Sequence, residues 1–561
     1  MTPPAILEEA PTQTLPTTRP KIGFVSLGCP KNLVDSEVMM GLLHQAGGEL
    51  TNHAEDAEIL VVNTCSFIDS AKQESVNTIL EMVQHKAANG GKAQRLIVAG
   101  CLVERYRDEI QKNIPEVDAV VGTGELEAIL TAAGLTLKPK TATNSPFNIL
   151  SQNAHSDLVS RAPSSVHQHS HPTESGAQLH PTANNVVLHD TPTKIVILSK
   201  GGALAAGVEE PAVAFRAEGT HREQQGRFSR ATWDGATAAL PEYLYSDETP
   251  RILTTPRASA YIKIAEGCDH PCSFCIIPQL RGKFRSRRLG SIVAEAQNLI
   301  AQGVREITLI GQDTTCYGED LGLKDGLADL LEALAPLPGL RWLRFLYAYP
   351  NKVTTRLLDT IARHDNIAKY LDVPLQHASP SVLKRMKRGG TPDLFLKLID
   401  KARTHVPGIV IRTSFIVGFP GETEADFQQL CDFVTAAKID WLGVFTYSDE
   451  EGAKAFELPD ELKIPKRTIE ARRRKLMRLQ QKISTKSKAT WVGREIDLLV
   501  EGESEETELL WQGRTPLHAP EIDGKVLIND FGPHESLVPG TFYRAEITES
   551  HDYDVVARIL E

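Results

Sequence analysis

Short apolar runs separated by longer amphipathic segments fill the N-terminal part of the chain. Three of the runs, KIGFVSLGC, AEILVVNTC and QRLIVAGC, each end in a cysteine. Helical spacing of apolar residues marks the segments between them, such as SEVMMGLLHQ and DSAKQESVNTILEMVQHK. Strand-like runs that alternate with helical segments are typical of βαβ units. We therefore predict an open parallel α/β domain over residues 21–137.

The same alternation returns after residue 250. Strand-like runs include EITLIGQDTT, LRWLRFLYAYP, KYLDVPLQH, GIVIRTSFIVGFPGET and WLGVFTYSDEEG, and helical stretches such as DFQQLCDFVTAAK separate them. Repeated strand, helix, strand units join by right-handed crossovers into a parallel sheet. We expect a full or partial (β/α) barrel over residues 250–488, with the basic segment KRTIEARRRKLMRLQQKISTKSK as a connecting helix. Active sites of such barrels lie at the carboxyl ends of the strands.

Residues 140–248 break both patterns. This insertion is rich in Ser, Thr, Pro and His, as in RAPSSVHQHSHPTESG, and it lacks a sustained apolar period. Such composition favours a mostly flexible surface segment. Six of its histidines could bind a metal, although a linker with incidental histidines is the favoured interpretation; the six are His155, His167, His169, His171, His180 and His189.

Length and cysteine content limit the setting of the protein. A chain of 561 residues predicts two to four domains. Its N-terminal residues resemble neither a signal peptide nor a transit peptide, and no apolar run is long enough to span a bilayer. We therefore expect a cytoplasmic protein with no membrane partner. Thiols stay reduced there, so clusters among the 8 cysteines predict metal ligands or reactive groups rather than disulfides.

One such cluster is the stretch EGCDHPCSFC, which contains Cys268, Cys272 and Cys275. Thiolates are ligands for zinc or iron–sulfur clusters, and the spacing C-x3-C-x2-C lets one loop wrap a single metal centre. The link through His270 is too short for that side chain to complete the same site. Three thiolates leave one coordination position open, which favours chemistry over a purely structural role. A zinc site completed by a distant residue is the alternative.

A second set is formed by Cys29, Cys65 and Cys101, each 36 residues from the next. Each cysteine ends one of the three apolar runs. Carboxyl ends of parallel strands meet at one edge of a sheet, so these cysteines can converge. Any one of them alone would be read as a buried core residue, but all three at equivalent strand ends predict a second three-thiolate cluster.

Motifs around both sets resemble known enzymes. C-x3-C-x2-C with Phe274 before the last cysteine is similar to the cluster loop of radical S-adenosylmethionine (SAM) enzymes, and VGFPGE resembles their glycine-rich SAM contact, which implies cofactor contacts at Gly418, Gly421 and Glu422. With SLGCPKNLVDSE, NTCSFIDSA, GCLVERY and CSFCIIPQLRGKFRSR, the chain resembles the methylthiotransferase family of radical SAM enzymes. CPKN, GQDTTCYG, YLDVPLQH and LKRMKRGG fit the branch that modifies a ribosomal protein. Cys316 and Cys431 match no family ligand and are interpreted as packing residues.

The resemblance implies two 4Fe-4S clusters, one on each cysteine set, and two SAM molecules for each product. The cluster on the C-x3-C-x2-C loop would generate a radical that removes hydrogen from the β-carbon of one aspartate in small-subunit ribosomal protein twelve. The second cluster would present sulfur to that carbon. Such a C–H bond is not acidic enough for general-base catalysis, so a cofactor must carry the step. A separate electron donor is also expected, and no protein acid or base is predicted.

The C-terminal part, residues 490–561, carries short alternating runs separated by Gly, Pro and Asp, which predict a small all-β barrel. QGRTPLHAPEIDGKVLI and HDYDVVARIL resemble the TRAM domain of this family, with His518 where many relatives have an acidic residue. Residues 491–561 contain 5 Lys and Arg against 16 Asp and Glu, a net charge of −11 that equals the charge of the whole chain. Nucleic-acid binding leaves a basic footprint, whereas an acidic module suits a basic ribosomal protein. An acidic face that only aids solubility explains the charge equally well.

Two other functions remain open at this point. A transfer RNA methylthiotransferase shares the same cysteine motifs. The acidic charge of the C-terminal barrel and the CPKN motif argue against this function. An iron–sulfur electron-transfer protein belongs to a different class, and three-thiolate sites argue against it because a carrier needs no open coordination position. The sequence does not decide whether RNA is contacted, or whether a free ribosomal protein or an assembling subunit is the substrate.

Overall fold

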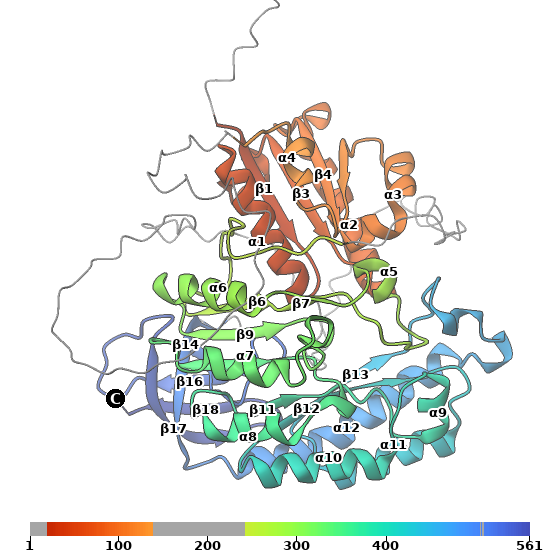
Figure 1. Cartoon of the computed structure of the whole chain (residues 1–561), viewed down its shortest axis with the longest axis vertical. Coiled ribbons are helices and arrows are strands. Elements are labelled where there is room, and N and C mark those ends of the chain that lie inside the picture. Colours follow the sequence, from red (N-terminus) through yellow and green to blue (C-terminus); the bar gives the residue numbers. More distant parts are fainter. Residues whose placement is uncertain (1–18, 138–241, 505–506, 508–509, 561) are drawn as a thin grey trace, which may run out of the picture.

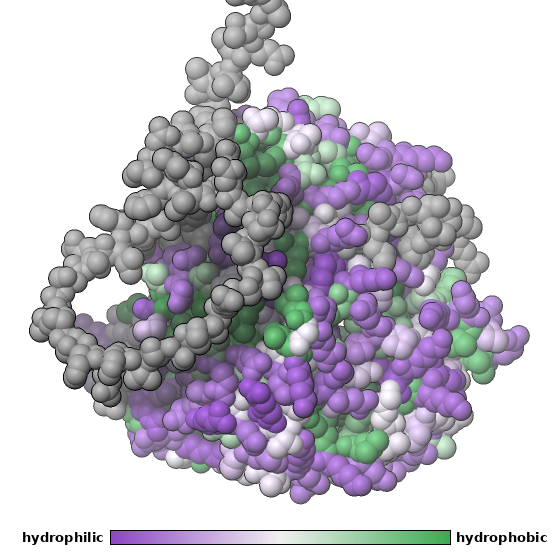
Figure 2. Space-filling model, viewed as in Figure 1, coloured by the Kyte–Doolittle hydropathy of each residue, from purple (hydrophilic) through white to green (hydrophobic). Residues whose placement is uncertain are grey.

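The structure of the chain is a computed structural model that describes residues 19–137, 242–504, 507 and 510–560 (Figure 1). Residues 140–241 of the predicted insertion, with the six histidines named above, lie outside the described residues. Within the described ranges, no helix combines the length and the apolar character needed to cross a membrane. Figure 2 shows mostly hydrophilic side chains on the described part of the visible face, with smaller hydrophobic areas between them.

The N-terminal domain is an open sheet of five parallel strands in the order β2-β1-β3-β4-β5, so the predicted parallel α/β fold is confirmed. Its strands are β1 (Lys21–Ser26), β2 (Glu49–Thr51), β3 (Ile59–Thr64), β4 (Arg95–Gly100) and β5 (Ala119–Val121). Its helices are α1 (Pro30–Gln45), α2 (Asp69–Val83), α3 (Cys101–Asn113) and α4 (Ala128–Ala133). Strand β3 is buried over its whole length, as expected of a parallel strand covered on both faces.

Alternating side chains of these strands supply two separate cores. Ile22, Val61 and Ile97 pack with side chains of α1 and α4 on one face of the sheet. Val62 and Val98 point to the other face, where they pack with α2 and α3. Because helices cover both faces, residues that follow the strands can meet only at the edge formed by the carboxyl ends.

The central domain contains six strands that follow one another in space in sequence order. They are β6 (Ser259–Lys263), β9 (Glu306–Ile310), β10 (Trp342–Phe345), β11 (Tyr370–Asp372), β12 (Val410–Val417) and β13 (Trp441–Thr446). Parallel pairing joins β6, β9 and β10 in one sheet and β11, β12 and β13 in another, and a bridge between Leu343 and Ile367 connects the two. Among the described residues no pairing joins β6 to β13, so the barrel is partial.

Helices on the outside of this arc close its hydrophobic core (Figure 1). They are α6 (Leu289–Ala301), α7 (Gly326–Leu334), α8 (Thr355–Arg363), α9 (Pro380–Arg385), α10 (Pro392–His405) and α11 (Glu424–Ala437). Local sequence fixes where several of them begin. Thr354 accepts a hydrogen bond from the backbone N–H of Leu357 at the start of α8, and Thr423 and Asp426 form a capping box at α11.

The C-terminal part is a closed five-stranded barrel in the order β14-β15-β16-β18-β17, which confirms the predicted all-β module. Its strands are β14 (Glu495–Glu503), β15 (Trp511–Arg514), β16 (Val526–Asp530), β17 (Phe542–Ser550) and β18 (Val555–Ile559). The basic segment before it forms the long helix α12 (Lys466–Ala489), as expected. A buried ion pair from Arg514 to Glu306, the first residue of β9, fastens this barrel to the central domain, and Arg344 of β10 pairs with the same carboxylate.

Candidate metal centres between the first two domains

The second cysteine set lies where the sequence places it, at the carboxyl ends of three parallel strands. Cys29 precedes α1, Cys65 follows β3 directly, and Cys101 is the first residue of α3. The loop that carries Cys29 lies so close to Cys65 that a Cβ on Gly28 would be 2.7 Å from the Cys65 Cβ. Gly28 also has a φ of +91°, a conformation that favours glycine. The sheet therefore brings the three thiols together, as predicted.

Burial makes two of these thiols, Cys65 and Cys101, reluctant to ionise. It raises the pKa of Cys65 to about 12 and that of Cys101 to about 11. Cys29 raises the pKa of both thiols further, and Cys101 raises that of Cys65, because their negative charges would lie close together; Arg281 opposes both shifts. Both thiols are free rather than joined in a disulfide.

The first set lies in the loop between β7 (Ala265–Glu266) and α5 (Ile277–Arg281), a loop that the strand β8 (Arg285–Ser286) closes from the other side. Burial raises the pKa of Cys268 to about 11 and that of Cys275 to about 12. Cys272 adds to both shifts, so the three thiols are near neighbours. A Cβ on Gly267 would lie 2.1 Å from the Lys283 carbonyl oxygen, so only glycine allows this tight fold.

Polar side chains brace this loop from the barrel. Arg388 donates a hydrogen bond to the Cys272 sulfur at 3.6 Å, and its guanidinium lies 4.4 Å from the centre of the Tyr349 ring. His270 stacks on the same Tyr349 ring at 3.9 Å, and its Nε2 lies 2.6 Å from Asp313 Oδ2. His270 is therefore engaged with Asp313, which agrees with the expectation that it does not complete the three-thiol site.

The two remaining cysteines differ from each other. Cys431 is buried in the hydrophobic core of the central domain, as a packing residue should be. Cys316 is only partly buried, and its Sγ donates to Asp313 Oδ2 at 3.1 Å. The interpretation of Cys316 as a packing residue is therefore incomplete, because its thiol also donates a hydrogen bond.

The residues predicted to contact SAM lie on the same side of the barrel. Phe274 packs beside Phe419 and Tyr447 in a small apolar cluster. Gly418 and Gly421 have φ values of +84° and +80°, so both positions adopt a backbone conformation that favours glycine. The direct SAM contacts at these positions stay a prediction.

Glu422 has contacts of its own within this turn. Its carboxylate accepts hydrogen bonds from the backbone N–H groups of Gly418 and Phe419, and it pairs with Arg472 of α12 at 3.0 Å. These hydrogen bonds show that Glu422 stabilises the backbone of the glycine-rich turn.

The two cysteine sets share one interdomain interface. Cys101 packs against Ile276 and Leu280, which directly follow the first set along the chain. Thr123 donates a hydrogen bond to the Leu280 carbonyl oxygen at 2.7 Å, which fixes the N-terminal domain against α5. The two sets are therefore carried by elements that meet at the interface between neighbouring domains, where α3 lies beside α5 (Figure 1).

The donor chemistry fits an iron–sulfur cluster at each set. Buried thiols with raised pKa values stay uncharged on their own, and a metal centre supplies the positive charge that converts them to thiolates. Each set offers three thiols, and the two other cysteines have different surroundings: Cys316 donates to Asp313, and Cys431 lies in the core of the central domain. Three thiolates leave one iron of a four-iron cluster open to another ligand.

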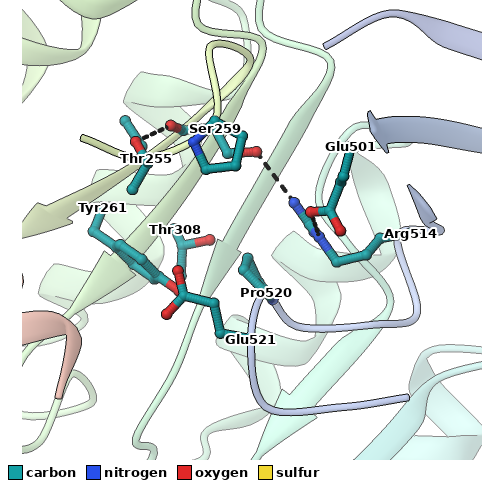
Figure 3. A pocket seen from close by; sticks show the side chains of 10 residues that line it. Thr255, Ser259, Tyr261, Thr308, Glu501, Arg514, Pro520 and Glu521 are labelled. Atoms are coloured by element: carbon teal, nitrogen blue, oxygen red, sulfur yellow. Dashed lines mark hydrogen bonds and ion pairs between the residues drawn. The ribbon is translucent and has the colours of Figure 1, made fainter. Parts of the chain in front are cut away.

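A cavity of about 30 Å³ lies elsewhere, between β6 and the C-terminal barrel (Figure 3). Ser259, Tyr261, Arg514 and Glu521 are among its lining residues, and none of the six cysteines is. It has room for about one water molecule. Arg514 donates to Ser259 Oγ at 3.1 Å, so this space belongs to the junction between two domains rather than to a substrate site.

Sequence reasoning missed the cationic and acidic partners of the sulfurs. Arg388 lies in the loop after α9 and Asp313 in the loop after β9. The motifs LKRMKRGG and GQDTTCYG that contain them matched the family branch but gave no indication of a contact with the cysteine loop. Arg281 lies in the basic run LRGKFRSR directly after the first set, so its proximity to that loop was available from the sequence. Its contact with the other domain was not.

Comparisons with known families agree with this arrangement. Three family models match successive parts of the chain, described as Uncharacterized protein family UPF0004 over residues 21–122, Radical SAM superfamily over residues 262–434, and TRAM domain over residues 492–560. The first contains the second cysteine set, the second contains the C-x3-C-x2-C loop, and the third covers the closed barrel. Fold and site thus define a radical SAM enzyme with an additional cysteine-bearing domain.

Relatives narrow this class. The chain is 62% identical over 546 residues to the ribosomal protein uS12 methylthiotransferase RimO of Koribacter versatilis (strain Ellin345), with 97% of each chain covered. It is 51% identical over 542 residues to the protein of the same name in Solibacter usitatus (strain Ellin6076), with 96% of this chain and 95% of the relative covered. The chain therefore belongs to the ribosomal protein uS12 methylthiotransferase family.

A solved structure of the radical SAM methyltransferase TsrM from Kitasatospora setae, with cobalamin and a [4Fe-4S] cluster bound, is 14% identical. The match covers 79% of this chain and 78% of that chain with a TM-score of 0.44, which is too distant to support an argument about function.

Proposed function

We propose that this protein is a radical SAM methylthiotransferase that adds a methylthio group to the β-carbon of an aspartate in ribosomal protein uS12. The observation that carries the proposal is the pair of three-thiol sets facing each other across one interface. An enzyme that must both remove a hydrogen atom and insert sulfur needs two centres close together. The identity of 62% to a relative named for this activity supports the substrate.

Six cysteines would hold the two clusters. Cys268, Cys272 and Cys275 would bind the cluster that contacts SAM, and Cys29, Cys65 and Cys101 would bind the second one. When bound, these groups and two SAM molecules supply the radical that removes hydrogen and the sulfur that replaces it. The protein itself positions them, since the loop after β7 and the three strand ends are both fixed by buried contacts.

The residues around the first set would hold the cofactor and limit access of water. Phe274, Gly418, Gly421 and Glu422 would border SAM, with glycines at the two positions where the backbone takes positive φ. The ring of Tyr349, held between His270 and Arg388, would close the site beside Cys272. No general acid or base is assigned, because the hydrogen is removed as an atom.

The C-terminal barrel would recognise the basic substrate. Its acidic residues include Glu503, Glu535 and Glu549, all exposed. Two of its five cations, Arg544 and Arg558, are already paired with Glu495 and Glu546 of neighbouring strands, which leaves few cations to offset the exposed carboxylates. A ribosomal protein with a positively charged surface would be attracted to this module, and the attraction would weaken with salt.

Several finer statements belong to the same proposal. The domain division would be residues 21–137, 250–488 and 490–561, with residues 140–248 inserted between the first two. A separate electron donor would reduce the clusters, and the reaction would take place in the cytoplasm, on uS12 that is either free or part of the assembling small subunit.

The intact mass of uS12 from cells with and without the gene tests this function, together with nucleoside analysis of their transfer RNA. Loss of one methylthio group from uS12, with unchanged transfer RNA, is expected. A loss confined to transfer RNA would contradict the proposed substrate and favour the transfer RNA branch.

A further inference from the structure

One arginine of the central domain reaches across the interface to the second cysteine set. Arg281, the last residue of α5, donates from Nη2 to the Cys101 sulfur at 3.4 Å. Its side chain is 2% exposed. Among the described residues no other side chain donates a hydrogen bond to a sulfur of this set. Arg281 lies six residues after Cys275, so the contact comes from the element that carries the first set.

The guanidinium of Arg281 is held by several acceptors at once. Nη1 pairs with Asp35 of α1 at 2.6 Å and lies 3.4 Å from Glu266, two residues before Cys268. Nη2 also donates to Asn32 Oδ1 at 3.1 Å. A planar fork of five donors can serve such a set of acceptors, whereas a lysine ammonium cannot reach them all in one geometry.

Asn32, which accepts a hydrogen bond from Arg281, also contacts the backbone beside the other two cysteines. Its Nδ2 donates to the carbonyl oxygens of Leu27 at 2.6 Å and of Thr64 at 3.2 Å. Leu27 lies two residues before Cys29, and Thr64 directly precedes Cys65. Arg281 therefore contacts one sulfur directly and anchors the residue that ties together the loops of the other two.

The buried charges at this place balance. Lys263 pairs with both Asp35 and Glu266, so the group contains two cations and two carboxylates. Gln312 donates to the free oxygen of Glu266 at 2.6 Å. A balanced, hydrogen-bonded group of this kind can stay ionised in the interior, whereas removal of one member leaves an uncompensated charge.

We propose that Arg281 is a positioning residue of the second cluster, and that its hydrogen bond to the Cys101 sulfur raises the reduction potential of that cluster. A positive donor beside a ligand sulfur stabilises the more negative, reduced state, and hydrogen bonds to sulfur are among the determinants of cluster potentials. Because the same side chain pairs with Glu266 at the base of the first loop, it also fixes the two centres relative to each other. This inference rests on the proposed function, since it requires a cluster on Cys29, Cys65 and Cys101.

The test uses the full chain with Cys268, Cys272 and Cys275 replaced by alanine, reconstituted anaerobically with iron and sulfide, so that only the second cluster is observed. Two charge-balanced variants are compared in this background. Arg281→Gln with Asp35→Asn removes the donor and keeps the Lys263–Glu266 pair. Lys263→Gln with Asp35→Asn is the matched control, because it removes the same number of charges and keeps Arg281.

Iron content and the midpoint potential by electron paramagnetic resonance are measured for both. A more negative potential in the Arg281 variant than in the control is expected. Loss of iron in the Arg281 variant alone would also support the inference, because a positioning residue is needed for assembly. Equal iron content with equal potentials would overturn it and leave the proposed function intact.

Absence of iron in the parent background would instead overturn the proposed second cluster, and the inference with it. Arg281→Lys and Lys263→Arg serve as milder variants if the double variants do not fold. A smaller shift in the same direction is expected for Arg281→Lys only, and identical potentials in these two would overturn the inference.

Discussion

The two cysteine sets each offer three thiols, but the chain brings the thiols together in different ways. Cys268, Cys272 and Cys275 lie within one loop of eight residues, whose fold depends on a glycine and a short β7–β8 pairing. Cys29, Cys65 and Cys101 are 36 residues apart and meet only when β1, β3 and β4 pair in parallel. The first site is therefore a local property of the chain, whereas the second is a property of the folded sheet.

This difference has a consequence for how each site responds to damage. A local loop can keep its ligands near one another even when packing around it loosens. A site assembled from three strand ends depends on the whole sheet and on its contact with the neighbouring domain. We expect perturbations of the fold to affect metal binding at the second set first.

Replacement of each set in turn should produce the largest effects. Reconstituted protein should bind about eight irons per chain, and either triple alanine variant about four. The variant without Cys268, Cys272 and Cys275 should lose SAM cleavage. The variant without Cys29, Cys65 and Cys101 should still cleave SAM but transfer no methylthio group. Iron analysis and detection of 5'-deoxyadenosine check this; continued SAM cleavage without the first set would be inconsistent with the assignment.

A buried ion pair at the domain interface offers the next test. Arg105 of α3 pairs with Glu450 at 2.6 Å, and its side chain is fully buried. Arg105→Met leaves Glu450 short of a buried partner and should lower the free energy of unfolding by about 3 kcal/mol. It should also speed the loss of iron to a chelator from the second set more than from the first.

Lys92→Met is the control for Arg105→Met, because Lys92 pairs with Asp56 on the exposed surface. It should cost less than about 1 kcal/mol. Urea unfolding and iron release measure both variants. Equal iron release from the two sets in Arg105→Met would remove the proposed difference between them.

Acid sensitivity of the C-terminal junction provides a perturbation away from both sets. Burial opposes ionisation of Glu306, but Arg514 and Arg344 overcome it and lower its pKa from 4.5 to about 2. The folded state therefore gains stability from this carboxylate above about pH 4.5, and that gain is lost as the pH falls toward 2. Glu306→Gln should lower the free energy of unfolding at pH 7 by about 3 kcal/mol and flatten its fall below pH 4.5.

Urea unfolding across this pH range, with iron content at pH 7, checks the variant. Both sets should retain their iron, which separates general destabilisation from damage to the sheet. A pH dependence as steep as that of the unmodified protein would show that Glu306 does not carry the acid effect.

A single methyl group gives the smallest and most specific perturbation of the second set. Gly28→Ala places a side chain at a φ of +91° and 2.7 Å from the Cys65 Cβ. The conformation costs about 1 kcal/mol and the overlap about 1–2 kcal/mol more. Gly90→Ala is matched, since Gly90 has a φ of +90° with nothing within 4 Å of the added atom. Iron at the second set should fall only in Gly28→Ala, and equal loss in both variants would attribute the effect to backbone strain alone.

Local and periodic signals explain which parts were predictable from the sequence. The spacing of the first set and the repeat of the second were both readable, because each depends on positions along the chain and on strand ends. The partial barrel and the parallel sheet followed from the alternation of strands and helices, and the small β-barrel followed from short alternating runs separated by Gly, Pro and Asp.

Side-chain partners from distant elements could not be predicted in this way. Arg281 and Asp35 are 246 residues apart and belong to different domains. Glu422 was predicted as a SAM contact from its motif alone, and no spacing indicated that Arg472, 50 residues away, would pair with it. Cys316 was interpreted as a packing residue because its partner Asp313 becomes relevant only once the loop after β9 is formed.

The central claim is that this protein methylthiolates uS12 by using both cysteine sets. The most direct measurement is the intact mass of purified uS12 after incubation with the reconstituted protein, SAM and a reductant. A gain of one methylthio group is expected with the unmodified protein, and no gain with the variant that lacks Cys29, Cys65 and Cys101 but still cleaves SAM. Methylthiolation by that variant, or an unchanged uS12 beside modified transfer RNA, would contradict the claim.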